Sequence, residues 1–250
     1  MKKILFVMAD YPGRKQEIFD KYLSPRTQQY CDYHKFEYRV YKKIDTGRKN
    51  LIWNKLFIAR DIVRNELEEG DVLTALDADM VMVKGGIPYE TNKSFSYAID
   101  NGNTHCMGNY TFRINDWSRS LIEKLTDEAF FQKFKENPSW QEWAEQAAWY
   151  HLAGIPRHSW IPYITMPHSG WHQVDYGWDR IPLEELYDHV EIRGPEWNTT
   201  LLEEEQGDPV SISLQKYNIF KSKKEDTIIR HWGGGQPWNY QEYCAKGLDF

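Results

Sequence analysis

Two aspartates, Asp77 and Asp79, interrupt an apolar run, "DVLTALDADMVMV" at 71–83. Burying an unpaired carboxylate in such a run costs several kcal/mol unless its charge is compensated. In a regular strand, residues two apart point to the same face, so both carboxylates can converge on one object. A hard divalent cation takes one or two carboxylates together with substrate phosphates. The pair is therefore a candidate cation site, and the alternative is a polar turn at the end of a strand.

A histidine and a run of glycines stand at the other end of the chain, in "IIRHWGGGQPW". Imidazole suits divalent ions such as Mn²⁺, and consecutive glycines let backbone N–H groups approach phosphate oxygens closely. We therefore expect His231 to bind the same cation as the aspartates, and Gly233 and Gly234 to bind the diphosphate. The alternatives are a structural histidine and a flexible turn.

The elements that must position these residues alternate between strands and helices in the first hundred positions. Apolar runs and alternation predict strands, and an apolar stripe at helical spacing predicts a helix that ends at Gly70. This order implies right-handed βαβ units and a single Rossmann-like, mostly parallel sheet flanked by helices, an α/β fold. The expected strands are 2–10, 36–44 and 71–83, and the expected helices are 14–35, interrupted near Pro25, and 54–70.

The later part of the chain contains further helices and then irregular sequence. A strand is expected at 94–100, followed by a helix at 114–135 that begins at Asn115 or Asp116 and a second helix at 139–154. Prolines, glycines and tryptophans are spread through 155–197, with short strand candidates at 158–166 and 188–194, and the tail at 227–238 reads as a strand running into a glycine turn. We expect one domain over 1–250 whose rear part is rich in loops.

The bulk composition excludes some classes of protein. The net charge of −6 argues against a protein held on nucleic acid mainly by phosphate neutralisation. The three cysteines have no metal-type spacing, which predicts free thiols in a reducing compartment. We expect a soluble, cytoplasmic protein, because the chain has no apolar run that spans a bilayer and its start fits a buried strand better than a signal peptide.

These motifs resemble the GT-A glycosyltransferases. The likeness rests on "LDADM" after a strand, preceded by the Trp-x-Lys of "LIWNKLFIARDIV". The closer match is the retaining α-galactosyl-, α-mannosyl- and xylosyltransferase family that includes the Golgi mannan enzymes and the plant xyloglucan xylosyltransferases. Four further stretches resemble segments of that family, over roughly 1–240: "NTHCMGNYTFRINDWSRSLIEKL", "WAEQAAWYHL", "PEWN" and "IIRHWGGGQPW".

The resemblance implies a role for each candidate residue. Residues 1–100 would bind a nucleotide sugar, with a UDP-sugar as the expected donor, and 101–250 would bind the acceptor and carry the metal-binding tail. The implied ligands of Mn²⁺ or Mg²⁺ are Asp77, Asp79 and His231. Lys55 would lie near the diphosphate, and Glu145 and Gln146 by the reacting sugar. The end of the first strand would line the nucleoside pocket, with Met8, Ala9, Asp10 and Tyr11.

The chemistry implied is transfer of a sugar to a hydroxyl group, with retention of configuration. A cation and Lys55 can stabilise the charge on the leaving diphosphate, and Glu145 can stabilise the oxocarbenium-like sugar. Trp171, Trp197 and Asn198 would build the acceptor site. The acceptor would be a glycan or another hydroxyl, a modified nucleobase included. Glu145 could instead be an exposed helix carboxylate, and each tryptophan could simply pack the loops.

Two other functions are compatible with the sequence. An inactive nucleotide-sugar or carbohydrate-binding module would keep the fold without catalysis, and the intact Asp77, Asp79 and His231 argue against it. A metal-dependent phosphotransferase or nuclease would want more clustered acidic ligands for two metal ions. Metal-dependent release of free nucleoside diphosphate from a nucleotide sugar separates the three.

Overall fold

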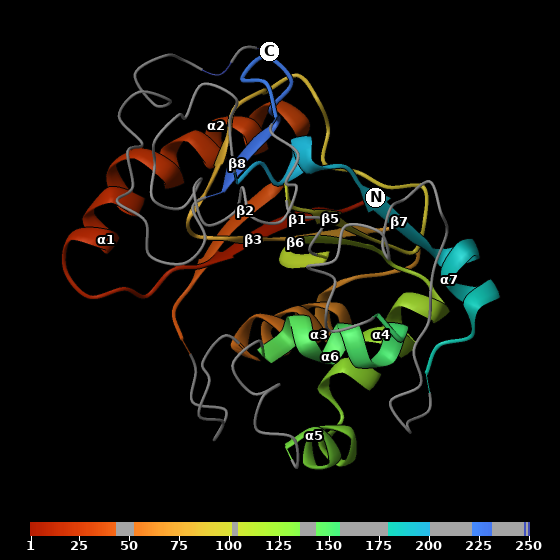
Figure 1. The fold of residues 1–250 in the computed structure, drawn as a ribbon. Helices are drawn as coiled ribbons and strands as arrows, with labels where there is room; N and C mark the ends of the chain where they lie inside the picture. The colour runs from red at the N-terminus through yellow and green to blue at the C-terminus, as the bar shows by residue number, and fades with distance from the viewer. Residues whose placement is uncertain are drawn as a thin grey trace, which may run out of the picture.

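The centre of the molecule is a six-stranded sheet in the order β2-β1-β3-β6-β5-β7 (Figure 1). It is seen in a computed structural model that describes residues 1–43, 53–101, 105–135, 144–155, 180–200, 222–231, 248 and 250. Every strand runs in one direction except β6, which is antiparallel to both of its neighbours, so the mostly parallel sheet is confirmed. The strands are β1 (Lys3–Met8), β2 (Glu37–Tyr41), β3 (Val72–Asp77), β5 (Phe95–Ile99), β6 (His105–Arg113) and β7 (Val190–Arg193).

Helices cover both faces of this sheet (Figure 1). Because side chains alternate along a strand, β1 supplies both layers: Ile4 and Phe6 pack in one apolar core, and Leu5 and Val7 pack in the other. The first core includes α3 (Asn54–Glu66), α4 (Asp116–Thr126) and α6 (Ala144–Ala153), and the second includes α2 (Ser24–His34). The remaining helical elements are α1 (Arg14–Ile18), η1 (Phe19–Leu23), α5 (Glu128–Lys135), α7 (Leu183–His189) and η4 (Pro195–Trp197).

The run 71–83 does not form the single strand that its apolar pattern predicts. β3 ends at Asp77, residues 78 and 79 form a turn, and β4 (Met80–Met82) begins a separate two-stranded sheet with β8 (Ile229–His231). β3 is hydrogen-bonded between β1 and β6, whereas β4 pairs antiparallel with a strand from the far end of the chain. The break follows from this change of partners, which no local pattern reveals.

The first helical segment is interrupted just before Pro25, as expected, whereas the expected end of the next helix is wrong. The interruption in the first helical segment is the π-helical turn η1, while Pro25 lies in the first turn of α2, where its missing N–H costs nothing. Helix α3 ends at Glu66 and not at Gly70, because Leu67 is extended and buried, and Gly70, with φ 84°, lies in the turn before β3.

The helices after β6 match expectation at their ends and differ in the middle. The expected N-cap of α4 is confirmed: Asn115 accepts a hydrogen bond from the Ser118 backbone N–H, and Ser118 completes a capping box. The expected single helix over 114–135 breaks at Asp127, which is extended, so that α5 is separate. The predicted end of α6 at Gly154, with φ 68°, is also confirmed.

Several expectations fall outside the described residues. These are the strand candidate at 158–166 and the site residues Trp171, Gly233 and Gly234. The other short strand candidate, at 188–194, corresponds to β7. Within the described part of the chain, none of the helices has the length and apolar character needed to cross a membrane.

Candidate active site

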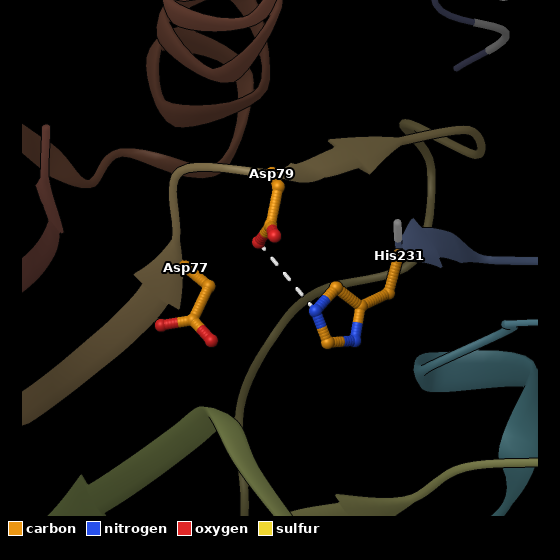
Figure 2. Close-up of side chains that lie close together, drawn as sticks. All are labelled: Asp77, Asp79 and His231. Atoms are coloured by element: carbon orange, nitrogen blue, oxygen red, sulfur yellow. Dashed lines mark ion pairs between the residues drawn. The ribbon is translucent and has the colours of Figure 1, made fainter. Parts of the chain in front are cut away.

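The carboxylates and the imidazole singled out in the sequence lie together at one end of the sheet (Figure 2). Asp77 is the last residue of β3, Asp79 lies in the turn that follows, and His231 is the last residue of β8. Each offers one ligand atom, and the three atoms lie within 4.8 Å of one another. The distance from His231 Nε2 to Asp79 Oδ1 is 3.5 Å. The expected convergence of these residues is therefore confirmed.

The register of the small sheet explains this convergence. His231 stands opposite Met80, the first residue of β4, so its side chain comes beside the preceding residue, Asp79. The expectation that one strand face presents both aspartates is wrong, since the turn redirects Asp79. The two carboxylates nevertheless converge. Figure 2 shows the side chains of Asp77, Asp79 and His231 facing one shared space from three directions.

The charge on His231 is shaped by its acidic neighbour. Burial alone would lower the pKa of His231, and the Asp79 carboxylate outweighs that effect and raises the pKa well above its usual value. On its other side, Nδ1 of the ring lies 2.9 Å from Oδ1 of Asn198. Two carboxylates and an imidazole are a donor set that suits Mg²⁺ or Mn²⁺, so the residues present fit a divalent cation.

A buried lysine lies directly beneath Asp77. Lys55 is in the first turn of α3, and its side chain is 1% exposed. Nζ donates hydrogen bonds of 2.6 Å to Asp77 Oδ1 and of 2.6 Å to the Met107 carbonyl oxygen, and it lies 3.3 Å from Glu145 Oε1. Burial alone would lower the pKa of Lys55, but the carboxylates of Asp77 and Glu145 more than offset it and raise the pKa. The ammonium group is thus surrounded by three oxygen acceptors of the protein.

The two candidate catalytic residues, Glu145 and Gln146, both lie on α6. Glu145 is buried, not the exposed helix carboxylate of the alternative interpretation, and burial raises its pKa to about 7, with Lys55 opposing the shift and Asp77 adding to it. Its Oε2 has no hydrogen-bond partner among the described residues. Oε1 of Gln146 accepts a hydrogen bond of 3.3 Å from the Met107 N–H. Lys55 and Gln146 therefore hold Met107 by its carbonyl and its amide.

Sequence reasoning missed the part that β6 plays in the site. Gly108 has no side chain, and a Cβ built there would lie 2.8 Å from Asp77 Oδ2 and 2.6 Å from Met80 Cε. Only glycine lets the strand come this close to the carboxylate. The clue in the sequence is the isolated glycine of "CMGNYTF", since such a glycine within a strand often marks a close approach.

The residues expected to line a nucleoside pocket lie next to Asp77. Met8, the last residue of β1, is paired with Asp77 in the sheet, so Ala9, Asp10 and Tyr11 continue from the neighbouring strand end. Ala9 is buried and Asp10 is exposed. Burial raises the pKa of Tyr11, and the carboxylates of Asp79 and Asp77 add to the increase. The three residues therefore adjoin the carboxylate cluster, and nucleoside binding stays a prediction.

The two described residues of the expected acceptor site differ in their surroundings. Trp197, in η4, is half-buried; its ring packs edge-on against Tyr89, with centroids 5.1 Å apart, and the Arg193 guanidinium lies 4.6 Å from its centroid. Asn198 is fully buried. The Asn198 side chain contacts His231, and its contact with an acceptor stays a prediction.

Comparisons with known proteins agree with this fold. The chain matches no protein-family profile and no curated protein sequence. Among solved structures, it is similar to a glycosyltransferase involved in the glycosylation of the major capsid of PBCV-1, with a TM-score of 0.52 and 11% identity over 98% of this chain and 99% of the other. It is also similar to the glycosyltransferase GlyE of Streptococcus pneumoniae TIGR4, with a TM-score of 0.50 and 12% identity over 98% of this chain and 60% of that one.

At these identities the likeness establishes the fold and nothing finer. The predicted GT-A-type α/β fold is confirmed, since both structures are glycosyltransferases and the sheet has the expected arrangement. The narrower resemblance to the Golgi mannan and xyloglucan enzymes stays a prediction.

Proposed function

We propose that this chain is a metal-dependent glycosyltransferase that moves a sugar from a nucleoside diphosphate sugar, with UDP as the nucleotide, to an acceptor hydroxyl. One observation carries the proposal. Asp77, Asp79 and His231 bring ligand atoms within 4.8 Å of one another at the C-terminal end of β3, although the histidine comes about 150 residues after the aspartates. In open α/β sheets, ligands bind outside these strand ends. The fold shared with known glycosyltransferases agrees with that placement.

The three ligands would hold Mn²⁺ or Mg²⁺ together with the donor's diphosphate. A bound divalent cation acts as a Lewis acid that stabilises negative charge on a departing diphosphate. The protein's part is to keep the carboxylates in place before the donor arrives. Lys55 does this for Asp77 through their 2.6 Å hydrogen bond, while its remaining acceptors are Met107 and Glu145. Lys55 therefore places a positive charge next to the proposed cation site and holds Asp77 in position.

Glu145 and Gln146 are the proposed residues on the side of the reacting sugar. Glu145 lies 3.3 Å from Lys55 and keeps one oxygen without a partner among the described residues. A carboxylate placed near an oxocarbenium-like sugar stabilises its positive charge. The retaining outcome is proposed on the resemblance. Tyr11 and the end of β1 would receive the nucleoside, and Gly233 and Gly234 the diphosphate.

The acceptor would dock on the irregular half of the molecule. Trp197 offers a half-buried indole near the cation ligands, because the next residue, Asn198, contacts His231. An aromatic ring of this kind suits stacking on a sugar. We propose Trp197 and Trp171 as acceptor contacts, and a glycan or another hydroxyl compound, a modified nucleobase included, as the acceptor.

The test is release of UDP from UDP-sugars by the pure protein, with Mn²⁺ and with EDTA. The expected result is Mn²⁺-dependent release that increases with an acceptor and is lost in His231→Ala. Asp61→Ala serves as the control, since this carboxylate is exposed on α3, away from the cluster. Binding of UDP-sugar with no turnover would indicate an inactive binding module. Consumption of a nucleoside triphosphate in place of a UDP-sugar would indicate a phosphotransferase.

A further inference from the structure

Asn198 is a buried residue whose side chain contacts one of the proposed metal ligands. It follows η4, is fully buried, and places Oδ1 2.9 Å from Nδ1 of His231. We propose that Asn198 is a positioning residue that sets the tautomer and orientation of His231, so that the Nε2 lone pair faces the cation. The inference rests on the proposed function, because it concerns a ligand of the proposed metal site.

The argument begins with the two nitrogens of the imidazole ring. A neutral ring carries its proton on one nitrogen and a lone pair on the other, and only the lone pair binds a metal. The amide oxygen of Asn198 accepts a hydrogen bond, so the nitrogen facing it, Nδ1, carries the proton. The lone pair is then on Nε2, which is the nitrogen 3.5 Å from Asp79 Oδ1. The amide thus selects the nitrogen that points at the carboxylates.

The backbone around Asn198 holds the amide at this place. The Thr199 N–H donates to the Ile229 carbonyl oxygen at 2.9 Å, and the His231 N–H donates back to the Thr199 carbonyl oxygen at 2.9 Å. Both bonds are made by Thr199, the residue after Asn198, and they tie the segment to β8. A third bond, of 2.7 Å, runs from Asn109 Nδ2 on β6 to the Trp197 carbonyl oxygen. The segment that carries Asn198 and the strand that carries His231 are therefore joined.

The orientation of the amide decides what the ring can do. If the amide were turned round, its NH₂ group would donate to an Nδ1 lone pair, and the ring proton would lie on Nε2. The nitrogen that faces Asp79 would then be unable to bind a cation. The two orientations thus predict opposite ligand nitrogens.

The first experiment measures binding of Mn²⁺ alone, by electron paramagnetic resonance, to the full chain. Asn198→Ala and Asn198→Leu remove the acceptor and should weaken binding roughly 10- to 100-fold, which is usual for loss of a group that orients a metal ligand. Asn198→Asp keeps an acceptor for Nδ1–H and should stay within about threefold of wild type. Wild-type affinity in Asn198→Ala or Asn198→Leu, or equal loss in Asn198→Asp, overturns the inference.

A matched control separates this effect from loss of packing. Asn101 is also fully buried; its side chain accepts a hydrogen bond from the Thr200 N–H at 2.7 Å and donates one to Ser222 Oγ at 2.8 Å. It is bonded to the same segment without contacting the imidazole in those bonds. Asn101→Ala should destabilise the fold and leave Mn²⁺ affinity near wild type. A loss of affinity equal to that of Asn198→Ala would make Asn198 merely structural.

The second experiment needs no variant and so does not depend on how Asn198→Ala folds. Nitrogen-15 spectra of the wild-type imidazoles, with Zn²⁺ as a diamagnetic probe, should show His231 protonated at Nδ1 and bound through Nε2. Zn²⁺ bound at Nδ1 would overturn the inference. If the wild type binds Mn²⁺ and the Asn198 variants bind it equally, this inference alone fails. If the wild type binds no Mn²⁺, the proposed function fails and the inference fails with it.

Discussion

Asp77 stands between two clusters of charged side chains that differ in exposure. In the inner cluster, the side chains of Lys55 and Glu145 are 1% and 5% exposed, and that of Asp77, which belongs to both clusters, is 33% exposed. The outer cluster, Asp77, Asp79 and His231, lies at the C-terminal end of the central strand β3, and the side chains of Asp79 and His231 are 19% and 10% exposed. The carboxylate at the end of β3 therefore takes part in two clusters that differ in their exposure to solvent.

The difference lies in how each cluster balances its charge. The inner cluster places an ammonium group against two carboxylates and a backbone carbonyl at short distances. The outer cluster adds a carboxylate and an imidazole with a 3.5 Å separation, and these side chains face a shared space (Figure 2). Buried charges that are already paired maintain a geometry, whereas converging oxygen and nitrogen ligands suit a cation from solution. We therefore assign the ordering of Asp77 to Lys55 in the inner cluster, and cation binding to the outer cluster.

The largest effect should come from breaking the outer cluster alone. Asp79→Ala should lower Mn²⁺-dependent UDP release roughly 1,000-fold, because a cation supplies several kcal/mol of charge stabilisation to the leaving group. The melting temperature should change little, since Asp79 lies in a turn and not in the core. Titration calorimetry with UDP and Mn²⁺ checks the binding step, with Asp61→Ala as the exposed control. Wild-type affinity in Asp79→Ala would remove the metal role of this residue.

Breaking the inner cluster should act on stability first. Lys55→Met leaves two carboxylates without their cation and should cost about 3–5 kcal/mol of unfolding free energy, as does removal of one partner from a buried ion pair. Urea denaturation gives this value. The control is Lys124→Met on the exposed face of α4, which should change stability by less than about 0.5 kcal/mol. A cost for Lys55→Met as small as that of the control would show that the inner cluster does not hold Asp77.

A third variant sharpens the comparison, because it disturbs Asp77 from the β6 side. Gly108→Ala places a Cβ 2.8 Å from Asp77 Oδ2 and 2.6 Å from Met80 Cε, and both atoms are ends of side chains that can turn away. We expect a stability cost of about 1–3 kcal/mol from overpacking. Because the carboxylate must turn, Mn²⁺ affinity should fall roughly tenfold. Unchanged Mn²⁺ affinity would mean that the close approach of β6 has no bearing on the outer cluster.

The most gradual effect concerns the pH dependence of stability. The pKa of Glu145 is raised from 4.5 to about 7, mainly by burial. A carboxyl group with a raised folded-state pKa binds its proton more tightly when folded, so this stabilisation is complete below about pH 4.5 and is lost as the pH rises through about 7. Relative to Glu145→Gln, the wild type should lose up to about 1.4 kcal/mol per pH unit in that window. A difference in unfolding free energy that stays constant from pH 5 to pH 7 would contradict this interpretation.

Local sequence patterns predict the sheet and the outer ligands well because those features depend on short-range periodicity and on residue chemistry. Apolar strand runs and the stripe of α3 predict the alternating layers, and Asp77, Asp79 and His231 stand out as carboxylates and an imidazole at strand ends. The break between β3 and β4 was missed, since it depends on pairing with β8, a strand about 150 residues away.

The inner cluster was harder to predict for the same reason. The resemblance assigns a role to Lys55 and to Glu145, but they lie 90 residues apart on helices, and nothing in the local sequence predicts that the fold brings them within 3.3 Å. Asn198 was predicted as an acceptor contact because "PEWN" resembles a segment of the family and lies in the irregular half of the chain. Its burial against His231 depends on pairing of the segment after η4 with β8, which the local sequence does not encode.

The central claim is that the outer cluster holds one divalent cation and, with it, a nucleoside diphosphate. An anomalous difference map, collected at the manganese edge from crystals grown with Mn²⁺ and UDP, tests this most directly. The account predicts a single strong peak within bonding distance of Asp79, Asp77 and Nε2 of His231, next to the UDP phosphates. Ordered UDP with no manganese peak at these side chains, or with the peak elsewhere, would contradict it.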